Sequence, residues 1–352
     1  MDIHRLPNRD VMNLDSVGCI ESTMGSITLN LKIRGGRFRH LWIVCALLAI
    51  TPAAVSRAAK QAQPTQLPGY KAVPVHYGPL NKMILSVSIN GHPANLLVDT
   101  GANQIILDAS AAESLDVRPS QHGLRYVRFT QINGQLFPVG FVRSVTAGSM
   151  NFGSSLVALR NSRDRSNFSN RAEDRNSHVD GVLGTDILLR HKAIINCRTK
   201  FIFFKVGRSR PLQLASVALS EKFTKVPLRQ EENGAFTVPC SIHGQSERLL
   251  VDTGAFVTTL NEANVKSLGI ALQPVQASAR FTNGVARRIS VGQINDFTIG
   301  DFRVPPAKFG AAVLPNFALR QGSTRINGIL GMDLLFICHG IIDFDSMSMF
   351  LK

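Results

Sequence analysis

The chain of 352 residues is long enough for two domains of ordinary size. Apolar residues make up 44% of it and charged residues 18%, a balance that excludes an intrinsically disordered chain. The formal net charge is +15, but the basic residues are scattered singly, so we expect a solvated basic surface and no nucleic-acid binding.

The first 58 residues have the layout of a secretory signal. Basic residues precede an apolar run at 41–50, and small residues then lead to an A-x-A-like site at 56–58. A membrane-spanning helix needs about 20 apolar residues, so the run is short for one. We therefore expect export to the periplasm or the medium, with an uncleaved membrane anchor through residues 41–54 as the alternative. Initiation at Met24 would give a signal of more ordinary length.

An internal repeat is the most informative feature of the sequence. The heptapeptide LLVDTGA occurs at Leu96–Ala102 and again at Leu249–Ala255, offset by 153 residues. Each copy is followed by a second matching segment, GVLGTD at Gly181–Asp186 and GILGMD at Gly328–Asp333. The chain therefore reads as a duplicated domain. The expected parts are a signal or anchor at 1–58, a linker at 59–74, a first lobe at 75–208 and a second lobe at 209–352.

Short segments of alternating apolar residues between turn signals predict a β-rich fold in each half. The expected hairpins pair 84–89 with 94–98, across Asn90-Gly91, and 236–242 with 248–251. Short helices are expected at 108–115 and 261–268, with Asp108 and Asn261 as N-cap candidates, and at 186–189 and 333–336. The expected closing strands are 201–206 and 347–351, and the polar segment 161–177 is expected to be an exposed loop.

The aspartate of each heptapeptide, Asp99 or Asp252, follows an apolar strand and lies at a tight turn. A carboxylate in such a place is costly unless function requires it. The threonine that follows can hydrogen-bond locally, and the glycine permits close approach of the backbone. Two carboxylates brought face to face cannot both ionise easily and share a proton. One can then deprotonate a water while the other donates to a carbonyl oxygen, with no metal or cofactor.

The paired motifs resemble the retropepsin-like aspartic proteases, in particular exported bacterial proteins in which two such domains are fused. The resemblance covers about residues 75–352 and implies an all-β, bilobed acid-protease fold made of two retropepsin-like β-barrel lobes. By it, Asp99 and Asp252 are the catalytic pair of an endopeptidase that acts on proteins or peptides. The residues expected to support the two catalytic loops are Thr100, Gly101, Ala102, Thr253, Gly254 and Ala255.

The resemblance also implies a β-hairpin flap after the first helix of each lobe. The segments Tyr126–Phe137 and Ala279–Ser290 fall in that place, and each contains an Asn-Gly turn signal. We expect two flaps, with ordinary surface hairpins as the alternative. The flap residues expected to meet substrate are Phe129, Gly134, Phe281 and Gly284.

The sequence departs from the family pattern at two kinds of place. Thr185 and Met332 stand where viral retropepsins have an arginine that helps to hold their dimer, a contact that a fused chain needs less. The residues after the two DTGA motifs also differ, being NQI at 103–105 and FVT at 256–258. We therefore expect an asymmetric cleft with unlike pockets on its two sides.

Ala102 and Ala255 bear on the pH dependence. Acid-working pepsin-like enzymes usually carry Ser or Thr at this place, and the hydroxyl stabilises the ionised carboxylate. Alanine removes that donor, so the pair should keep its shared proton to higher pH. The prediction is activity at mildly acidic to near-neutral pH.

Other kinds of site have less support. The motifs GxSxG, HExxH, GxxxxGK[ST] and GxGxxG do not occur. Cys197, Cys240 and Cys338 have no metal-ligand spacing and are expected to be mostly buried thiols, with one disulfide as the alternative. We expect a monomer with an intramolecular pair of lobes. Two alternatives stay open: a catalytically silent exported peptide-binding module on the same fold, and pairing of each lobe with a lobe of another chain.

Overall fold

The computed structural model describes residues 67–119, 121–122, 126–132, 135–160, 178–207, 214–280, 286–321 and 323–352. The chain divides into two units, Met1–Ala58 and Ala59–Lys352, and every described element belongs to the second. The expected signal at 1–58, the loop at 161–177 and the linker before residue 67 lie outside the described residues. Within the described ranges, no helix combines the length and apolarity that crossing a bilayer requires.

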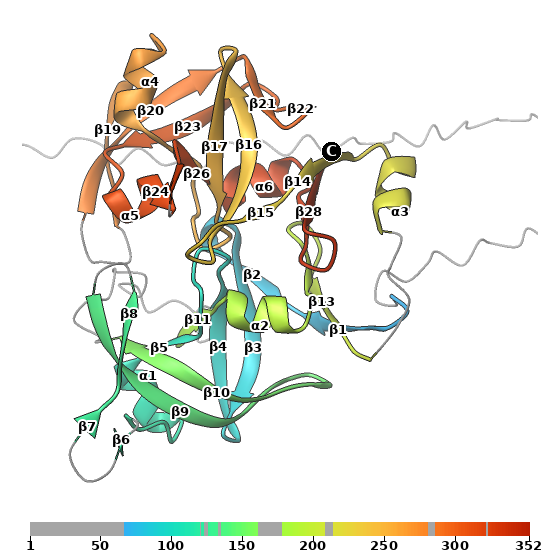
Figure 1. Cartoon of the computed structure of the whole chain (residues 1–352), viewed down its shortest axis with the longest axis vertical. Helices are drawn as coiled ribbons and strands as arrows, with labels where there is room; N and C mark the ends of the chain where they lie inside the picture. The colour runs from blue at the N-terminus through green and yellow to red at the C-terminus, as the bar shows by residue number, and fades with distance from the viewer. Residues whose placement is uncertain are drawn as a thin grey trace, which may run out of the picture. The chain divides into compact units, whose positions relative to one another are not determined.

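The first half of the second unit forms one mainly antiparallel sheet (Figure 1). In order across the sheet, its strands are β2 (His76–Gly78), β3 (Lys82–Ile89), β4 (His92–Val98), β11 (Gly181–Leu183), β5 (Ile106–Asp108), β10 (Met150–Arg160), β9 (Gln135–Ala147) and β8 (Phe129–Ile132). Strand β3, near one edge of the sheet, also pairs with β9, near the other edge. The sheet therefore curls back on itself.

The second half repeats this plan. In order across its sheet, the strands are β19 (Gln273–Arg280), β20 (Ala286–Ile294), β23 (Ala307–Ala312), β18 (Thr259–Asn261), β26 (Gly328–Leu330), β17 (Gln245–Val251), β16 (Phe236–Ile242), β21 (Phe297–Ile299) and β22 (Phe302–Arg303), with β15 (Arg229–Gln230) paired to β16. Hairpin β16–β17 corresponds to β3–β4, and β26 lies parallel to β17 as β11 does to β4. The predicted all-β fold of two like halves is confirmed.

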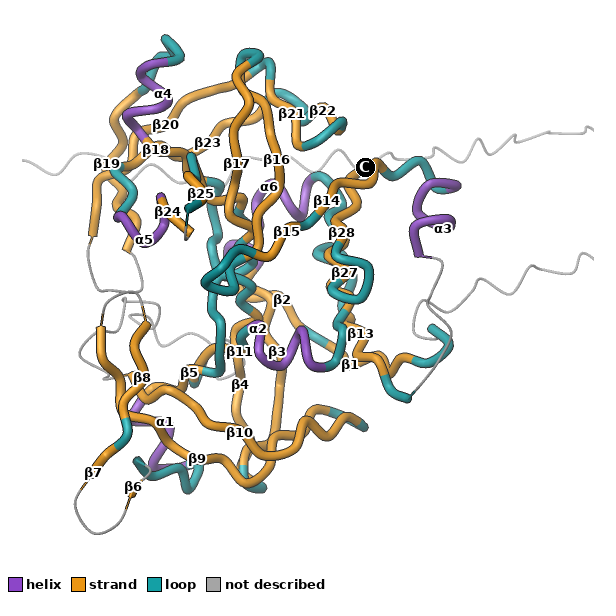
Figure 2. Tube along the Cα trace, in the orientation of Figure 1, coloured by secondary structure: helices purple, strands orange, loops and turns teal. Residues whose placement is uncertain are grey.

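The helices that have a counterpart in the other half are short, and Figure 2 shows them among the strands. They are α1 (Ala109–Ser114) and α2 (Thr185–Arg190) in the first half, and α4 (Glu262–Ser267) and α6 (Met332–Ile337) in the second. Asp108 and Asn261 stand at the N-cap positions of α1 and α4, but neither side chain makes a capping hydrogen bond. Asp108 instead forms an ion pair with Arg160 at 2.8 Å. Such a charge-assisted hydrogen bond is stronger than a capping hydrogen bond between neutral groups.

The remaining elements are minor. They are the 3₁₀ helix η1 (Pro79–Asn81), strands β6 (Gln121–His122) and β7 (Tyr126–Val127), helix α3 (Leu214–Ser220), helix α5 (Asn316–Leu319), and strands β24 (Arg320–Gln321) and β25 (Thr324–Arg325). Strands β24 and β25 form a two-stranded ladder of their own. Cys197, Cys240 and Cys338 are buried free thiols, as expected.

A third sheet combines strands from both halves. In order, its strands are β1 (Tyr70–Pro74), β13 (Phe201–Lys205), β12 (Ile194–Asn196), β27 (Ile341–Asp343), β28 (Ser348–Leu351) and β14 (Thr224–Pro227). Residues 70–74, expected to be linker, thus form an antiparallel pair with β13. The expectation failed because the partner of β1 lies more than 100 residues away, and because its alternation of buried and exposed residues is short. The halves meet where β12 pairs with β27.

Asp345 connects the two halves beside this joint sheet. Its carboxylate accepts hydrogen bonds from Lys192 at 2.6 Å, from Lys205 at 2.5 Å and from the Tyr70 hydroxyl at 3.3 Å, all residues of the first half. Burial raises the pKa of Asp345, but the hydrogen bonds and charges of the two lysines outweigh this and hold it below its usual value. The ionised carboxylate is therefore the form that the fold favours.

Replacing Asp345 by asparagine is expected to lower the free energy of unfolding at pH 7 by about 2 kcal/mol, because Lys205 loses its countercharge. A depressed folded pKa stabilises the fold above the unfolded pKa of about 3.9, and this contribution disappears as the pH falls through the folded value. Urea unfolding at pH 7 and at pH 3 should therefore show a smaller gap between variant and wild type at pH 3. An equal gap at both pH values would contradict the assignment.

Candidate active site

Asp99 and Asp252 occupy equivalent loops, one at the end of β4 and the other at the end of β17. The backbone N–H of Asp99 donates to the carbonyl oxygen of Leu183 at 3.1 Å, and that of Asp252 donates to Leu330 at 3.0 Å. Leu183 and Leu330 belong to the apolar-apolar-Gly segments, which run parallel to β4 and β17 as β11 and β26. Each segment therefore supports the aspartate of its own half from the neighbouring strand.

The residues after these segments hold the far end of each loop. The Thr185 N–H donates to the Ala102 carbonyl oxygen, and the Met332 N–H donates to that of Ala255, both at 2.8 Å. These contacts use only the backbone, so they do not depend on the side chain at either place. The absence of arginine at Thr185 and Met332 leaves the two loops supported.

Thr100 and Thr253 lock the two loops together by crosswise hydrogen bonds. The Thr100 hydroxyl donates to the Val251 carbonyl oxygen at 2.8 Å and accepts from the Thr253 N–H at 3.0 Å. The Thr253 hydroxyl likewise donates to the Val98 carbonyl oxygen at 2.8 Å and accepts from the Thr100 N–H at 3.0 Å. Both threonines are fully buried, so no water competes for these four bonds.

The lock brings the two carboxyl groups into hydrogen-bond contact with each other. Each also accepts from the backbone of its own loop: Asp99 Oδ1 from the N–H groups of Gly101 at 2.7 Å and Ala102 at 3.1 Å. Asp252 Oδ1 accepts in the same way from the N–H groups of Gly254 at 2.8 Å and Ala255 at 3.1 Å. One oxygen of each carboxyl group is thus fixed by its loop.

The glycine of each DTG motif leaves room for the opposite carboxyl group. A Cβ atom on Gly101 would lie 2.6 Å from Cγ of Asp252, and one on Gly254 would clash equally with Asp99. A contact this short is not tolerated, so any other residue at either glycine would push the pair apart. Glycine is required here for the close approach of the second half.

The electrostatics of the pair favour a shared proton. Burial raises the pKa of Asp99 well above its usual value, and the charge of Asp252 adds to the rise. Burial also raises the pKa of Asp252, while hydrogen bonds from Asp99 and the loop backbone partly oppose this. Two carboxyl groups in contact and shielded from water release their protons in two separate steps, and the pair holds one proton between these steps.

The two expected flap segments form hairpins. Strands β8 and β9 pair up to Ile132 and Gln135, and β19 and β20 pair up to Arg280 and Ala286. The first hairpin reaches its catalytic loop, where the Gln104 amide donates to the Thr130 hydroxyl at 3.4 Å. Phe129 is exposed on β8. Gly134, Phe281 and Gly284 lie outside the described residues.

Each DTGA loop borders an apolar cluster, and the two clusters differ. The first apolar cluster consists of Ala102, Ile106, Phe137, Ala158 and Val182, with Leu97 and Ile132 packed against it. The second apolar cluster consists of Leu250, Leu314, Ala318, Ile326 and Ile329, with Ala235, Ala255 and Leu319 packed against it. The first includes the β8–β9 hairpin, whereas the second includes helix α5. The dyad therefore has different apolar neighbours on its two sides.

Sequence reasoning missed two features near the site. Helix α5 and strand β25 were not predicted, because four-residue and two-residue elements carry no periodic signal. Lys82 was not singled out either, yet its ammonium group lies 5.1 Å from the ring centroid of Phe256, in the segment after the second DTGA motif. A lone lysine at the start of a strand gives no sequence signal for a cation–π contact.

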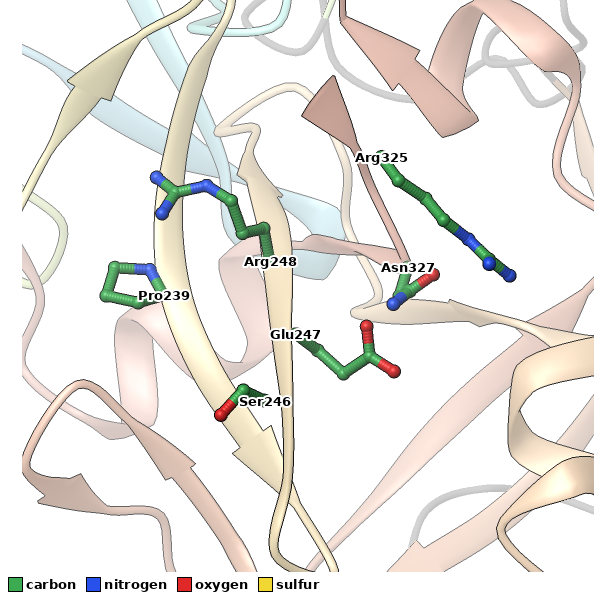
Figure 3. Close-up of a pocket in the computed structure, with 6 residues that line it drawn as sticks. All are labelled: Pro239, Ser246, Glu247, Arg248, Arg325 and Asn327. Atoms are coloured by element: carbon green, nitrogen blue, oxygen red, sulfur yellow. The ribbon is translucent and has the colours of Figure 1, made fainter. Parts of the chain in front are cut away.

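A cavity of about 400 Å³ lies in the second half, away from the dyad. Figure 3 shows its lining residues, which are Pro239, Ser246, Glu247, Arg248, Arg325 and Asn327. Neither aspartate lines it, so it is not part of the carboxylate site. Over the described part of the chain, no three His, Cys, Asp or Glu side chains are grouped so as to hold a metal ion.

Known proteins resemble both halves of the chain. A family model described as aspartyl protease matches residues 85–187 and 238–334, which together make up more than half of the chain. The crystal structure of aspartic proteinase from Irpex lacteus is 15% identical, with a TM-score of 0.44 and coverage of 80% of this chain and 97% of that one. Basic 7S globulin from soybean is 12% identical, with a TM-score of 0.44 and coverage of 81% and 94%. No curated protein matches.

Replacing Thr253 by valine is expected to lower the free energy of unfolding by about 2–4 kcal/mol, because it leaves the Val98 carbonyl and the Thr100 N–H buried without partners. Serine at the same position keeps the hydroxyl and should retain most of the stability. Urea unfolding of the two variants measures the difference. A smaller loss for valine than for serine would show that the methyl group, not the hydroxyl, matters at this position.

Proposed function

Because the chain belongs to the aspartyl protease family, we propose that it is an aspartic endopeptidase, in which Asp99 and Asp252 activate a water for hydrolysis of peptide bonds in proteins. One observation carries the proposal: the two carboxyl groups are in hydrogen-bond contact, each on a loop fixed by its own backbone. Such a pair is costly to bury and gives the fold no evident benefit, which favours a catalytic role.

The chemistry follows from the single shared proton. The ionised carboxylate takes a proton from the water as the water oxygen bonds to the substrate carbonyl carbon. The protonated carboxyl group donates to the carbonyl oxygen, which carries the developing charge. The carboxyl group that took the water's proton then gives it to the leaving nitrogen as the C–N bond breaks. The other carboxylate takes back a proton from a hydroxyl of the tetrahedral carbon, so the pair returns to its singly protonated form. The proposal assigns the two roles to the pair and not to either residue alone.

The two apolar clusters support a substrate with apolar side chains around the cleaved bond. Ala102 and Ala255 belong to these clusters and also donate their N–H groups to the aspartates, so apolar surface adjoins both carboxyl groups. An extended peptide could place apolar side chains on each side of the dyad. Since one chain supplies both loops, we propose a monomer that binds protein and not nucleic acid.

We further propose that the protein is exported, to the periplasm or the medium. The support is the order of basic, apolar and small residues over 1–58, which is typical of a secretory signal. Retention of residues 41–54 as an anchor would leave the same catalytic part outside the membrane.

Replacing Asp99 or Asp252 by asparagine is expected to lower peptide cleavage about 10³-fold or more, because neither variant can both accept and donate a proton at the pair. The measurement is cleavage of a peptide library, read by mass spectrometry over a range of pH. Asparagine keeps the size of the side chain, and the folded state of each variant can be checked by circular dichroism. If wild-type protein cleaves nothing at any pH, a silent peptide-binding module is the better description. If both variants stay active, the assignment of Asp99 and Asp252 as the catalytic pair fails.

The pH profile of kcat/KM is expected to be bell-shaped and centred at mildly acidic to near-neutral pH. Activity rises as the pair loses its first proton and falls as it loses the second, and burial raises both pKa values. Serine at both Ala102 and Ala255 adds a hydroxyl that favours the ionised form, so the double variant should shift the profile to lower pH. A wild-type optimum below pH 3, or no shift in the variant, would oppose this account.

A further inference from the structure

Glu231 is a buried carboxylate in the second half that the catalytic chemistry does not use. Only 4% of its side chain is exposed, and it lies just after strand β15. It accepts two hydrogen bonds from Arg229, at 2.9 and 2.7 Å, one from the Thr324 hydroxyl at 2.7 Å, and one from the Thr237 hydroxyl. Arg248 adds an ion pair at 3.6 Å. The network thus connects β15, β16, β17 and β25.

The surroundings of Glu231 favour the ionised form of its carboxyl group. Burial raises the pKa of Glu231, but hydrogen bonds from Arg229, Thr237 and Thr324 outweigh this and lower it to about 2. Hydrogen bonds that an ionised carboxylate accepts are about twice as strong as neutral ones. The network is therefore a firm anchor for the segments that it joins.

Two routes lead from Glu231 to the second apolar cluster. The Glu231 N–H donates to the carbonyl oxygen of Ala235, a member of the cluster, at 2.8 Å. The side chain holds Thr324, and two residues later the Ile326 N–H donates to the Leu319 carbonyl oxygen at 2.7 Å. Ile326 and Leu319 belong to the same cluster. Helix α5 and strand β25 are thereby fixed to the core of the second half.

The cluster in turn touches the catalytic loop. Ala255 packs against it and donates its N–H to Asp252 Oδ1 at 3.1 Å. Leu319 and Ala255 are only half-buried, so the cluster offers apolar surface beside this aspartate. A shift of α5 would change that surface without touching either carboxyl group.

A side-chain hydrogen bond adds to the packing that holds β25 in place. Side chains alternate between the two faces of an extended segment, so Thr324 and Ile326 share one face while Arg325 and Asn327 share the other. Arg325 and Asn327 line the cavity of about 400 Å³ that Figure 3 shows. Ile326 and Asn327 are buried and hold the far end of this segment by packing, whereas Arg325 is exposed, so the strand itself relies on the hydrogen bonds that Thr324 makes to Glu231 and Arg229.

The first half has no copy of this anchor. The repeat offset of 153 residues places Gly78 opposite Glu231, Ile84 opposite Thr237 and Asn95 opposite Arg248. The anchor therefore acts on one side of the dyad only. On the first side, the apolar cluster beside the dyad includes residues of the β8–β9 hairpin instead.

We propose that Glu231 is a positioning residue for substrate specificity: through Thr324 it holds α5 and β25 in the place where they form an apolar binding wall beside Asp252. The wall receives the apolar side chain on one side of the cleaved bond. The inference rests on the proposed function, since it assumes that a peptide lies across the dyad.

Replacing Thr324 by valine tests the inference, because valine keeps the shape and removes only the hydroxyl, which donates to Glu231 and accepts from Arg229. The test needs two pairs of peptides, and within each pair one peptide has leucine where the other has alanine. In the first pair this residue is on one side of the cleaved bond, and in the second pair it is on the other side. We expect the variant to lose about tenfold of its leucine-over-alanine preference, mainly through KM, on one side only. Serine at Thr324 keeps the hydroxyl and should keep the preference, and Glu231→Gln should reduce it in the same direction as valine.

Asp345→Asn is the matched control, since it disrupts another carboxylate held by cations, and the side chains that hold it, Tyr70, Lys192 and Lys205, all belong to the first half. It should lower stability and leave both preferences unchanged. Binding of the same peptides with a reduced, uncleavable central bond provides a second measurement by calorimetry. If valine and serine at Thr324 give the same preferences as wild type, or if all peptides are affected equally, Glu231 is merely structural and the inference is overturned.

The two proposals can fail separately. Cleavage that depends on Asp99 and Asp252, with preferences unaffected at Thr324, would retain the peptidase and remove the role of Glu231. Binding without cleavage, with a one-sided loss of preference in Thr324→Val, would remove the peptidase and retain the binding wall. Wild-type protein that neither cleaves nor distinguishes the peptides would contradict both.

Discussion

Two carboxyl groups in direct contact repel each other once both ionise, and the arrangement of the whole second unit keeps them together. The crosswise bonds of Thr100 and Thr253 can form only if β4 and β17 end opposite each other. That condition in turn requires the parallel strands β11 and β26 behind the loops, and glycines at positions where a Cβ would separate the pair. The joint sheet and Asp345 also connect the two halves, so the threonine hydrogen bonds are not the only contacts that hold the halves together.

The features that sequence predicted are those that local pattern determines. A repeated heptapeptide with an aspartate after three apolar residues could be placed at the end of a strand, and Asn90-Gly91 could be placed in a turn. In the structure, Asn90 and Gly91 have φ of 52° and 91°, the backbone that a two-residue hairpin requires and that asparagine and glycine tolerate. Because the motif occurs twice in one order, the duplication and the pairing of Asp99 with Asp252 followed from the repeat, without knowledge of any distance.

The features that sequence did not predict depend on partners far along the chain. Residues 70–74 were predicted to be a linker, because the strand that pairs with them, β13, begins only at Phe201. Glu231 was not singled out from the sequence, because its partners Thr237, Arg248 and Thr324 come from three other segments. The alternation of apolar residues along a strand predicts which of its faces is buried. It does not predict which other strand lies beside it, so such contacts have no local sequence signal.

The two halves also diverge behind the dyad, at Ile105 and its repeat equivalent Thr258. The Thr258 hydroxyl donates to Asp333 at 2.7 Å and accepts from the Gly331 N–H at 3.0 Å, so it braces the second catalytic loop against β26. Ile105 has no hydroxyl, and within the described residues Oδ1 of its neighbour Asp186 is buried without a partner. A symmetric dimer of identical chains would carry the same residue in both places. Fusion into one chain removes that constraint, and a peptide, which has a direction, can then be bound by two loops that differ.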